Sequence, residues 1–227
     1  MGGDNGTSYT VIPDASGNWS VPVSKFNGVT DMSKMFYGCT NLTSLDLSSF
    51  DTSNVTKMTN MFYNCSSLNT LNLSGWNTSK VTNMYSMFES CTNLTSLDLS
   101  HFNTEKVTDM SNMFSRTPLI SLDLSHFNTS NVTKMDCMFQ NCSSLTTLDL
   151  SHFNTENVTK MDAMFQNCSS LTTLDLSGWD TSNVTDINYW IFQGCSNIQT
   201  IRMAGCSEET INKIKRVKPS SCTIVTE

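Results

Sequence analysis

Apolar and polar residues follow one pattern that returns at a nearly constant interval along most of the chain. A valine opens each copy, and the residue numbers of successive valines differ by 26, 26, 26, 25, 26 and 26. The seven valines are Val29, Val55, Val81, Val107, Val132, Val158 and Val184. A fixed period in this range predicts a solenoid, in which each repeat is one unit that buries its apolar side against its neighbours.

Two shorter periods alternate within each unit. After Val55, the residues Met58, Met61, Phe62 and Cys65 are spaced as i, i+3, i+4 and i+7, which predicts one face of a short helix. Residues 68–73 then read Leu-x-x-Leu-x-Leu, and the alternation at their end predicts a short strand over residues 70–74. Asn, Thr and Ser follow, and they predict a turn before the next valine.

Two of the seven units depart from this pattern. The fourth unit is one residue short and lacks the cysteine, since residues 113–119 read Met-Phe-Ser-Arg-Thr-Pro-Leu. The seventh unit gains a residue within 187–192 and has Ile198, Ile201 and Met203 where the others have leucine. These are the positions where we expect the stack to be irregular.

The two ends of the chain do not follow the repeat. Within residues 1–28, two short apolar alternations flank a turn at 14–18, which predicts a polar leader and a hairpin that caps the first unit. At the other end, Ser207 precedes Glu208 and Glu209, and basic residues follow before Pro219. This charge order predicts a helix, followed by a closing strand at 222–226. The sequence therefore predicts three parts: 1–28, the repeats 29–206, and a cap 207–227.

The composition narrows the classes of partner. The net charge is −7, which argues against binding to nucleic acid or to anionic membranes. The sequence has no signal peptide and no apolar run as long as a membrane span, so we expect no membrane insertion by this chain. Charged residues make up only 15%, and Ser, Thr and Asn fill the polar positions instead, as stacked side chains of one charge would repel.

The repeated motif resembles a known family. Phe-x-x-Cys followed by Leu-x-x-Leu-x-Leu-Ser, with Val-Thr-x-Met ahead of it, resembles the BspA-like leucine-rich repeats of bacterial surface proteins over residues 29–206. The Asp-Thr-Ser-Asn-Val-Thr turns are similar to the variant found in lactic acid bacteria and mycoplasmas. The resemblance implies a curved solenoid on exported, wall- or lipid-anchored proteins, with adhesion or partner binding as its role. It implies no catalytic residues and no cofactor.

Pattern and resemblance together predict an α/β solenoid. It would be a right-handed, leucine-rich-repeat-like stack of about seven strand–turn–short-helix units between two caps. We expect it to be a monomer.

Cysteines recur at one position of the unit. Their column consists of Cys39, Cys65, Cys91, Cys142, Cys168 and Cys195. Zinc sites need clustered pairs that this spacing lacks, so a buried ladder of small side chains is the favoured interpretation over a metal array. Cys206 and Cys222 flank the predicted cap helix, and their pairing in a disulfide stays open. Cys137 has no equivalent in other units and is expected to be an exposed free thiol.

An aromatic column and a histidine column also run along the repeats. The aromatic column supplies one large apolar residue per unit, as a core requires, although sugar-binding modules also use such rows. Its members are Phe50, Trp76, Phe102, Phe127, Phe153 and Trp179. His101, His126 and His152 occupy one position held elsewhere by Gly or Ser, which favours a solvated rim over a metal site.

The candidate binding surface is the outward-facing residue at the centre of each strand. This column contains Asp46, Asn72, Asp98, Asp123, Asp149, Asp175 and Arg202. Consecutive aspartates about one strand spacing apart repel each other, so stability alone would favour Asn or Thr there. Recognition of a basic or hydroxyl-rich partner, or bound cations, would explain the charge. The alternative is that the aspartates only keep the open face soluble.

These observations favour a binding module over an enzyme. We expect a non-catalytic module of an extracellular bacterial cell-surface protein that contacts a protein or glycan of a host or neighbouring cell through the strand face. The alternative is a structural spacer that holds another domain away from the cell surface. No metal or cofactor site is expected in either case.

Overall fold

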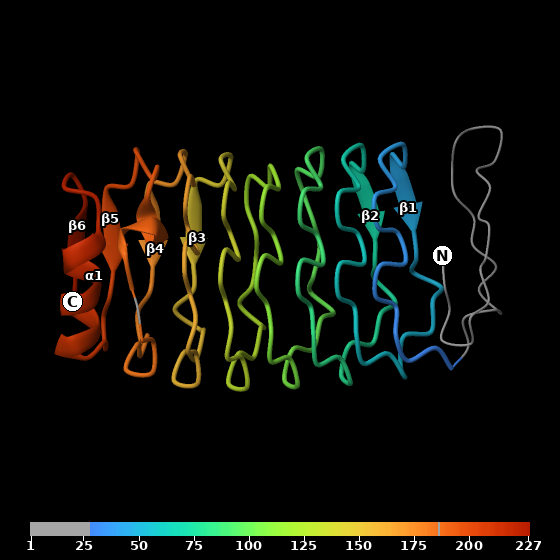
Figure 1. Cartoon of the computed structure of the whole chain (residues 1–227), viewed down its shortest axis with the longest axis horizontal. Coiled ribbons are helices and arrows are strands. Elements are labelled where there is room, and N and C mark those ends of the chain that lie inside the picture. The colour runs from blue at the N-terminus through green and yellow to red at the C-terminus, as the bar shows by residue number, and fades with distance from the viewer. Residues whose placement is uncertain (1–27, 186) are drawn as a thin grey trace.

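The chain folds as a parallel β-solenoid of about seven turns, which confirms the predicted solenoid, although its helix content is small. The computed structural model describes residues 28–185 and 187–227. Successive units lie side by side along one long axis, with β1 near one end and the C-terminal helix α1 at the other (Figure 1). The predicted N-terminal leader and hairpin lie, except for residue 28, outside the described residues.

Short parallel strands form one face of the stack. β1 (Ser44–Asp46) pairs in register with β2 (Thr70–Asn72). A second sheet contains β3 (Thr147–Asp149), β4 (Thr173–Asp175), β5 (Thr200–Arg202) and β6 (Thr223–Val225) in that order. The central residues Leu148 and Leu174 are 3% and 0% exposed, and their neighbours on the outer face are more open. The predicted inward and outward positions of the strands are confirmed.

The prediction of a short helix in each unit is wrong. The N–H of Met61 closes a turn onto the carbonyl of Met58 at 3.2 Å, but the next N–H, of Phe62, bonds at 2.9 Å to Met87 in the following unit. Asn60 and Asn64 have φ angles of 55° and 56°, in the left-handed region that ends a helix. Successive turns thus reproduce the helical spacing of apolar residues. The seventh unit alone, among the described ones, has a 3₁₀ helix there, η2 (Tyr189–Phe192).

These turns build a second parallel ladder on a face of their own. One residue of each of six successive units bridges to the next without interruption. The bridged residues are Asp31, Lys57, Asn83, Asp109, Lys134 and Lys160. This ladder holds the spacing of the units independently of the strands.

The core between the two ladders is aromatic and close-packed. Phe36 and Phe62 stack with ring centroids 5.5 Å apart and planes at 4°, and the same contact continues unit by unit as far as Phe192. The second aromatic column is also buried, and the indole N–H of Trp76 donates to the carbonyl of Leu47 at 3.0 Å. Both observations confirm that this column belongs to the core.

The C-terminal cap has the predicted helix and strand. Ser207 accepts a hydrogen bond from the N–H of Thr210 at the start of α1 (Glu208–Val217), and β6 closes the sheet beside β5. Cys206 and Cys222 are both free thiols, so the disulfide that the sequence left open is not formed. Of the described helices, none is long and apolar enough to cross a bilayer.

Candidate functional site

The candidate binding column lies on the strand face, where the pattern placed it. Asp46 pairs with Asn72 across β1 and β2, and Asp175 lies between Asp149 and Arg202 in the second sheet. Four aspartates of the column are exposed: Asp46, Asp98, Asp123 and Asp149. Asp175 is half-buried. Asp98 and Asp123 belong to units three and four, whose segments pair with neither β2 nor β3.

Each Asp or Asn of the column also has a structural role that the sequence analysis missed. Its side-chain Oδ1 accepts the backbone N–H of the serine two residues later, at 2.9–3.1 Å. This bond lowers the pKa of Asp98 and Asp123 below the ordinary value for a carboxyl. Asn72 makes the same bond to Ser74, so the turn requires the oxygen and not the charge.

The charge of the column is not neutralised by ion pairs within the described residues. The two salt bridges there join Lys134 to Asp109 and Lys213 to Glu209, and neither involves the strand face. The serine bonds are the largest cause of the lowered pKa values; the charges of His101 and His126 also lower the pKa of Asp98, and that of His126 lowers the pKa of Asp123. The column therefore presents ionised carboxylates to solvent at neutral pH.

The strand ladder is interrupted in the middle of the stack. Leu47 N–H bonds to the carbonyl of Asn72, and Leu150 N–H bonds to that of Asp175, each at 2.9 Å. Over the described residues, no equivalent bond reaches the carbonyls of Asp98 and Asp123. A hollow with a volume of about 480 Å³ opens there, which we call the strand-face hollow. Its lining is Asn69, Thr70, Leu71, Ser96, Leu97, Asp98, Ser121 and Asp123.

The missing residue of the fourth unit coincides with this interruption. The deletion falls in the turn at residues 115–119, directly before the segment that fails to pair. A smaller notch of about 270 Å³ lies at the deletion, between Arg116 and Pro118 of this unit and Thr92 and Ser143 of its neighbours. Ile120, which follows, is 57% exposed. The shortened valine spacing was the sequence signal for this irregularity, and its effect on the strand face was not predicted.

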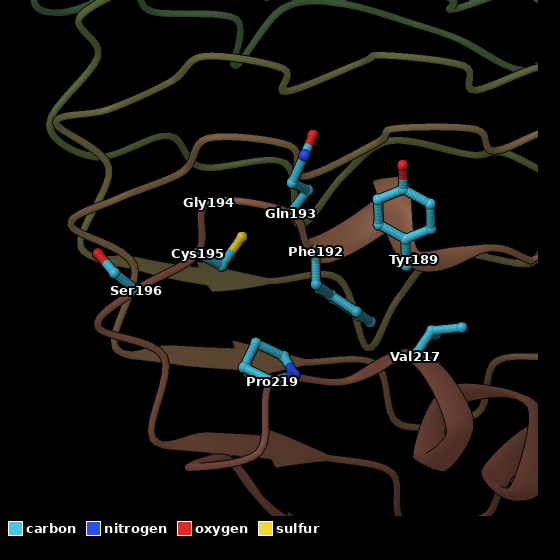
Figure 2. Close-up of a pocket in the computed structure, with 8 residues that line it drawn as sticks. All are labelled: Tyr189, Phe192, Gln193, Gly194, Cys195, Ser196, Val217 and Pro219. Atoms are coloured by element: carbon cyan, nitrogen blue, oxygen red, sulfur yellow. The ribbon is translucent and has the colours of Figure 1, made fainter.

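A second hollow lies where the last repeat meets the cap. It has a volume of about 360 Å³ and, as Figure 2 shows, Tyr189 and Val217 lie on one side of it and Ser196 on the other. Tyr189 is 57% exposed, and its ring stacks on the half-open ring of Trp190 with centroids 4.6 Å apart. The extra residue of the seventh unit coincides with this exposed pair. This second hollow shares no residue with the acidic column.

The cysteines are placed as a ladder. Cys65, Cys91, Cys142, Cys168 and Cys195 are buried, which confirms the favoured interpretation, and Cys39 is half-buried. Cys137 is half-buried as well, so the prediction of an exposed thiol is wrong; its left-handed φ of 54° turns the backbone there. Among the described residues, no three His, Cys, Asp or Glu side chains are grouped as metal ligands.

The site supports recognition chemistry. Its carboxylates accept hydrogen bonds from neighbouring serine N–H groups, and those bonds favour the ionised form. Carboxylates with lowered pKa are poor proton donors or bases near neutral pH, but they attract cations and accept hydrogen bonds. The arrangement can present a row of negative charge and acceptors to a partner.

Comparisons with known proteins give a family and distant structural neighbours. A family profile described as "Mycoplasma protein of unknown function, DUF285" matches residues 14–97 and 90–203. No curated protein sequence matches. A leucine-rich repeat protein from Bacteroides ovatus is 14% identical over 92% of this chain and 77% of its own, with a TM-score of 0.26. The pneumococcal vaccine antigen PcpA is 11% identical over 82% of this chain and 66% of its own, with a TM-score of 0.30.

Proposed function

This chain belongs to the family described as mycoplasma proteins of unknown function, DUF285, and we propose that it is a non-catalytic binding module of a bacterial cell-surface protein. The strand face is its binding surface. The resemblance of the repeats to BspA-like surface proteins supports the location, and the acidic column supports the role.

One observation carries the proposal. Asn72 accepts the same hydrogen bond from its serine N–H that the aspartates accept from theirs. Four consecutive units nevertheless carry Asp at this position. These units hold Asp98, Asp123, Asp149 and Asp175. An amide oxygen accepts the same bond, so the turn does not require the negative charge, and like charges in successive rungs repel. A role in attracting a partner accounts for the charge.

The chemistry of the face indicates the class of partner. Ionised carboxylates favour basic groups, and the serines and threonines beside them favour polar, hydroxyl-bearing groups. The partner is a protein or glycan at the surface of a host or neighbouring cell. Complementary charge on such a partner would speed association, and this effect would weaken with salt.

The test uses binding of the fluorescently labelled protein to fixed epithelial cells, measured by flow cytometry. A variant with Asp98→Asn, Asp123→Asn, Asp149→Asn and Asp175→Asn keeps every serine turn but removes four charges. The proposal predicts an unchanged or raised melting temperature and a loss of most binding. Equal binding by parent and variant, or no binding by the parent, would contradict it. A control variant, Lys106→Gln with Lys134→Gln, changes charges away from the strand face and should bind like the parent.

A further inference from the structure

We propose that the strand-face hollow seats one long cationic side chain, lysine or arginine, from a basic segment of a protein partner. This inference rests on the proposed function and names the partner class for one place on the strand face. It differs from general attraction by the acidic column, because it requires the hollow that the second, third and fourth units line.

The apolar floor of the hollow fits the stem of such a side chain. Leu71 and Leu97 line it, and both are half-buried, whereas the equivalent Leu45 in β1 and Leu148 in β3 are each 3% exposed. Its volume of about 480 Å³ falls within the range of about 300–1,000 Å³ of small ligand sites. Lysine and arginine bury their methylene stems on apolar surface while the charged head stays at a polar rim.

The rim fits the charged head. Asp98 and Asp123 both line the hollow, and the Oδ1 of each carboxylate accepts the serine N–H. A carboxylate has about four acceptor sites, so each can accept further hydrogen bonds. Within the described part of the chain, the backbone carbonyls of the same two residues accept no hydrogen bond from the preceding unit. An ammonium or guanidinium group, which carries only donors, satisfies both kinds of acceptor.

An inserted partner strand is a poorer fit than a side chain. A strand entering between two units needs about twice the usual spacing of about 4.8 Å. The turn ladder prevents this, because it bridges Lys57 to Asn83 and Asn83 to Asp109 in the three units that line the hollow. The N–H of Met58 bonds to the carbonyl of Asn83 at 3.1 Å, and the N–H of Met84 bonds to the carbonyl of Asp109 at 3.1 Å. The units therefore cannot separate, and the opening admits a side chain only.

The first experiment measures binding of a labelled hexalysine peptide by fluorescence anisotropy at low salt. The comparison peptide is a hexamer of 2,4-diaminobutyric acid, which has the same charge on a stem two methylenes shorter. Two double variants remove equal charge: Asp98→Asn with Asp123→Asn inside the hollow, and Asp149→Asn with Asp175→Asn outside it. The inference predicts a loss of about tenfold in hexalysine affinity for the inner pair, about threefold or less for the outer pair, and a preference for lysine.

A second variant removes the hollow and keeps the charges. Copying residues 141–144 in place of residues 116–118 gives the fourth unit the usual length. The variant should protect the amides of residues 97–99 from hydrogen exchange and lose about tenfold in hexalysine affinity. If this variant does not fold, the two double variants still decide the question.

Three results would overturn the inference: equal losses in the two double variants, equal affinity for the two peptides, or no hexalysine binding by the parent. None of them bears on the cell-binding assay, whose outcome depends on the whole acidic column. Loss of cell binding in the quadruple variant together with any of these results would leave the strand face as the binding surface and exclude the hollow as its specific site.

Discussion

The Sγ of Cys65 donates a hydrogen bond of 3.0 Å to the carbonyl oxygen of Phe36 in the preceding unit. The same bond recurs at 2.9–3.2 Å for Cys91, Cys142, Cys168 and Cys195. Each of these thiols therefore links neighbouring units through a weak donor. Thr117, in the short fourth unit, instead donates to Phe114 of its own unit.

This burial predicts that most thiols are unreactive in the folded protein. The five buried column cysteines should react with a disulfide reagent such as DTNB only after unfolding, because the reagent attacks exposed thiolates. The half-buried Cys39, Cys137 and Cys206 should react first, and slowly. Rapid reaction of six or more thiols before unfolding would show that the ladder is not buried.

The same burial predicts a loss of stability at alkaline pH. Burial raises the pKa of Cys91 to about 12 and those of Cys142 and Cys195 to about 11, from an ordinary value of 9.0. Since the unfolded chain loses these protons more readily, their contribution is fully present below about pH 9 and declines between about pH 9 and pH 12. Urea midpoints measured across this range should fall with pH.

A matched variant assigns that fall to the thiols. Replacing Cys91, Cys142 and Cys195 with Ala removes three of the thiols whose pKa burial raises but leaves the other cysteines, the tyrosines and the lysines. Its midpoint should be lower than that of the parent at neutral pH and should depend less on pH above 9. Parallel curves for parent and variant would mean that other groups cause the alkaline loss.

Neighbouring positions of one strand should differ sharply in their effect on stability. Leu148→Ala should lower the free energy of unfolding by about 2–5 kcal/mol, because Leu148 is 3% exposed within the core. Thr147→Ala, at an exposed position of the same strand, should cost less than about 1 kcal/mol. Urea midpoints of the two variants measure the difference. Similar losses would contradict the inward and outward assignment of the strand.

Two substitutions of Asp149 separate its charge from its hydrogen bond. Asp149→Asn keeps an oxygen for the N–H of Ser151, which lies 2.9 Å away, and it removes repulsion from Asp175. Its urea midpoint should equal or exceed that of the parent. Asp149→Ala loses the acceptor as well and should cost about 0.5 kcal/mol, a small value because the group is solvent-screened. An equal loss in both variants would mean that the charge itself stabilises the turn.

The periodic part of the fold was predictable because it repeats. The valine spacing predicted the stacked repeats. The alternation of apolar and polar residues correctly predicted that Leu148 faces inward. The turns at Asn60 and Asn64 were not predictable from apolar spacing, because a series of turns places apolar residues on one face at the same spacing as a helix does. Their left-handed backbone depends on hydrogen bonds to the next unit, which no local pattern contains.

The candidate site was predictable only in part. Alternation predicted the outward position of Asp98, and the serine two residues later was the sequence signal for the side-chain turn. The strand-face hollow depends on how the shortened fourth unit fits between units of full length, which is a property of packing in three dimensions.

The most direct measurement is the salt dependence of cell binding. The labelled parent and the quadruple Asp→Asn variant are compared on fixed epithelial cells between about 0.1 M and about 1 M NaCl, over which the Debye length falls from about 10 Å to about 3 Å. If the acidic column is the binding surface, binding of the parent declines steeply with salt, and the variant binds weakly at every concentration. Parent binding that is independent of salt, or curves that coincide for the two proteins, would contradict recognition through the charged strand face.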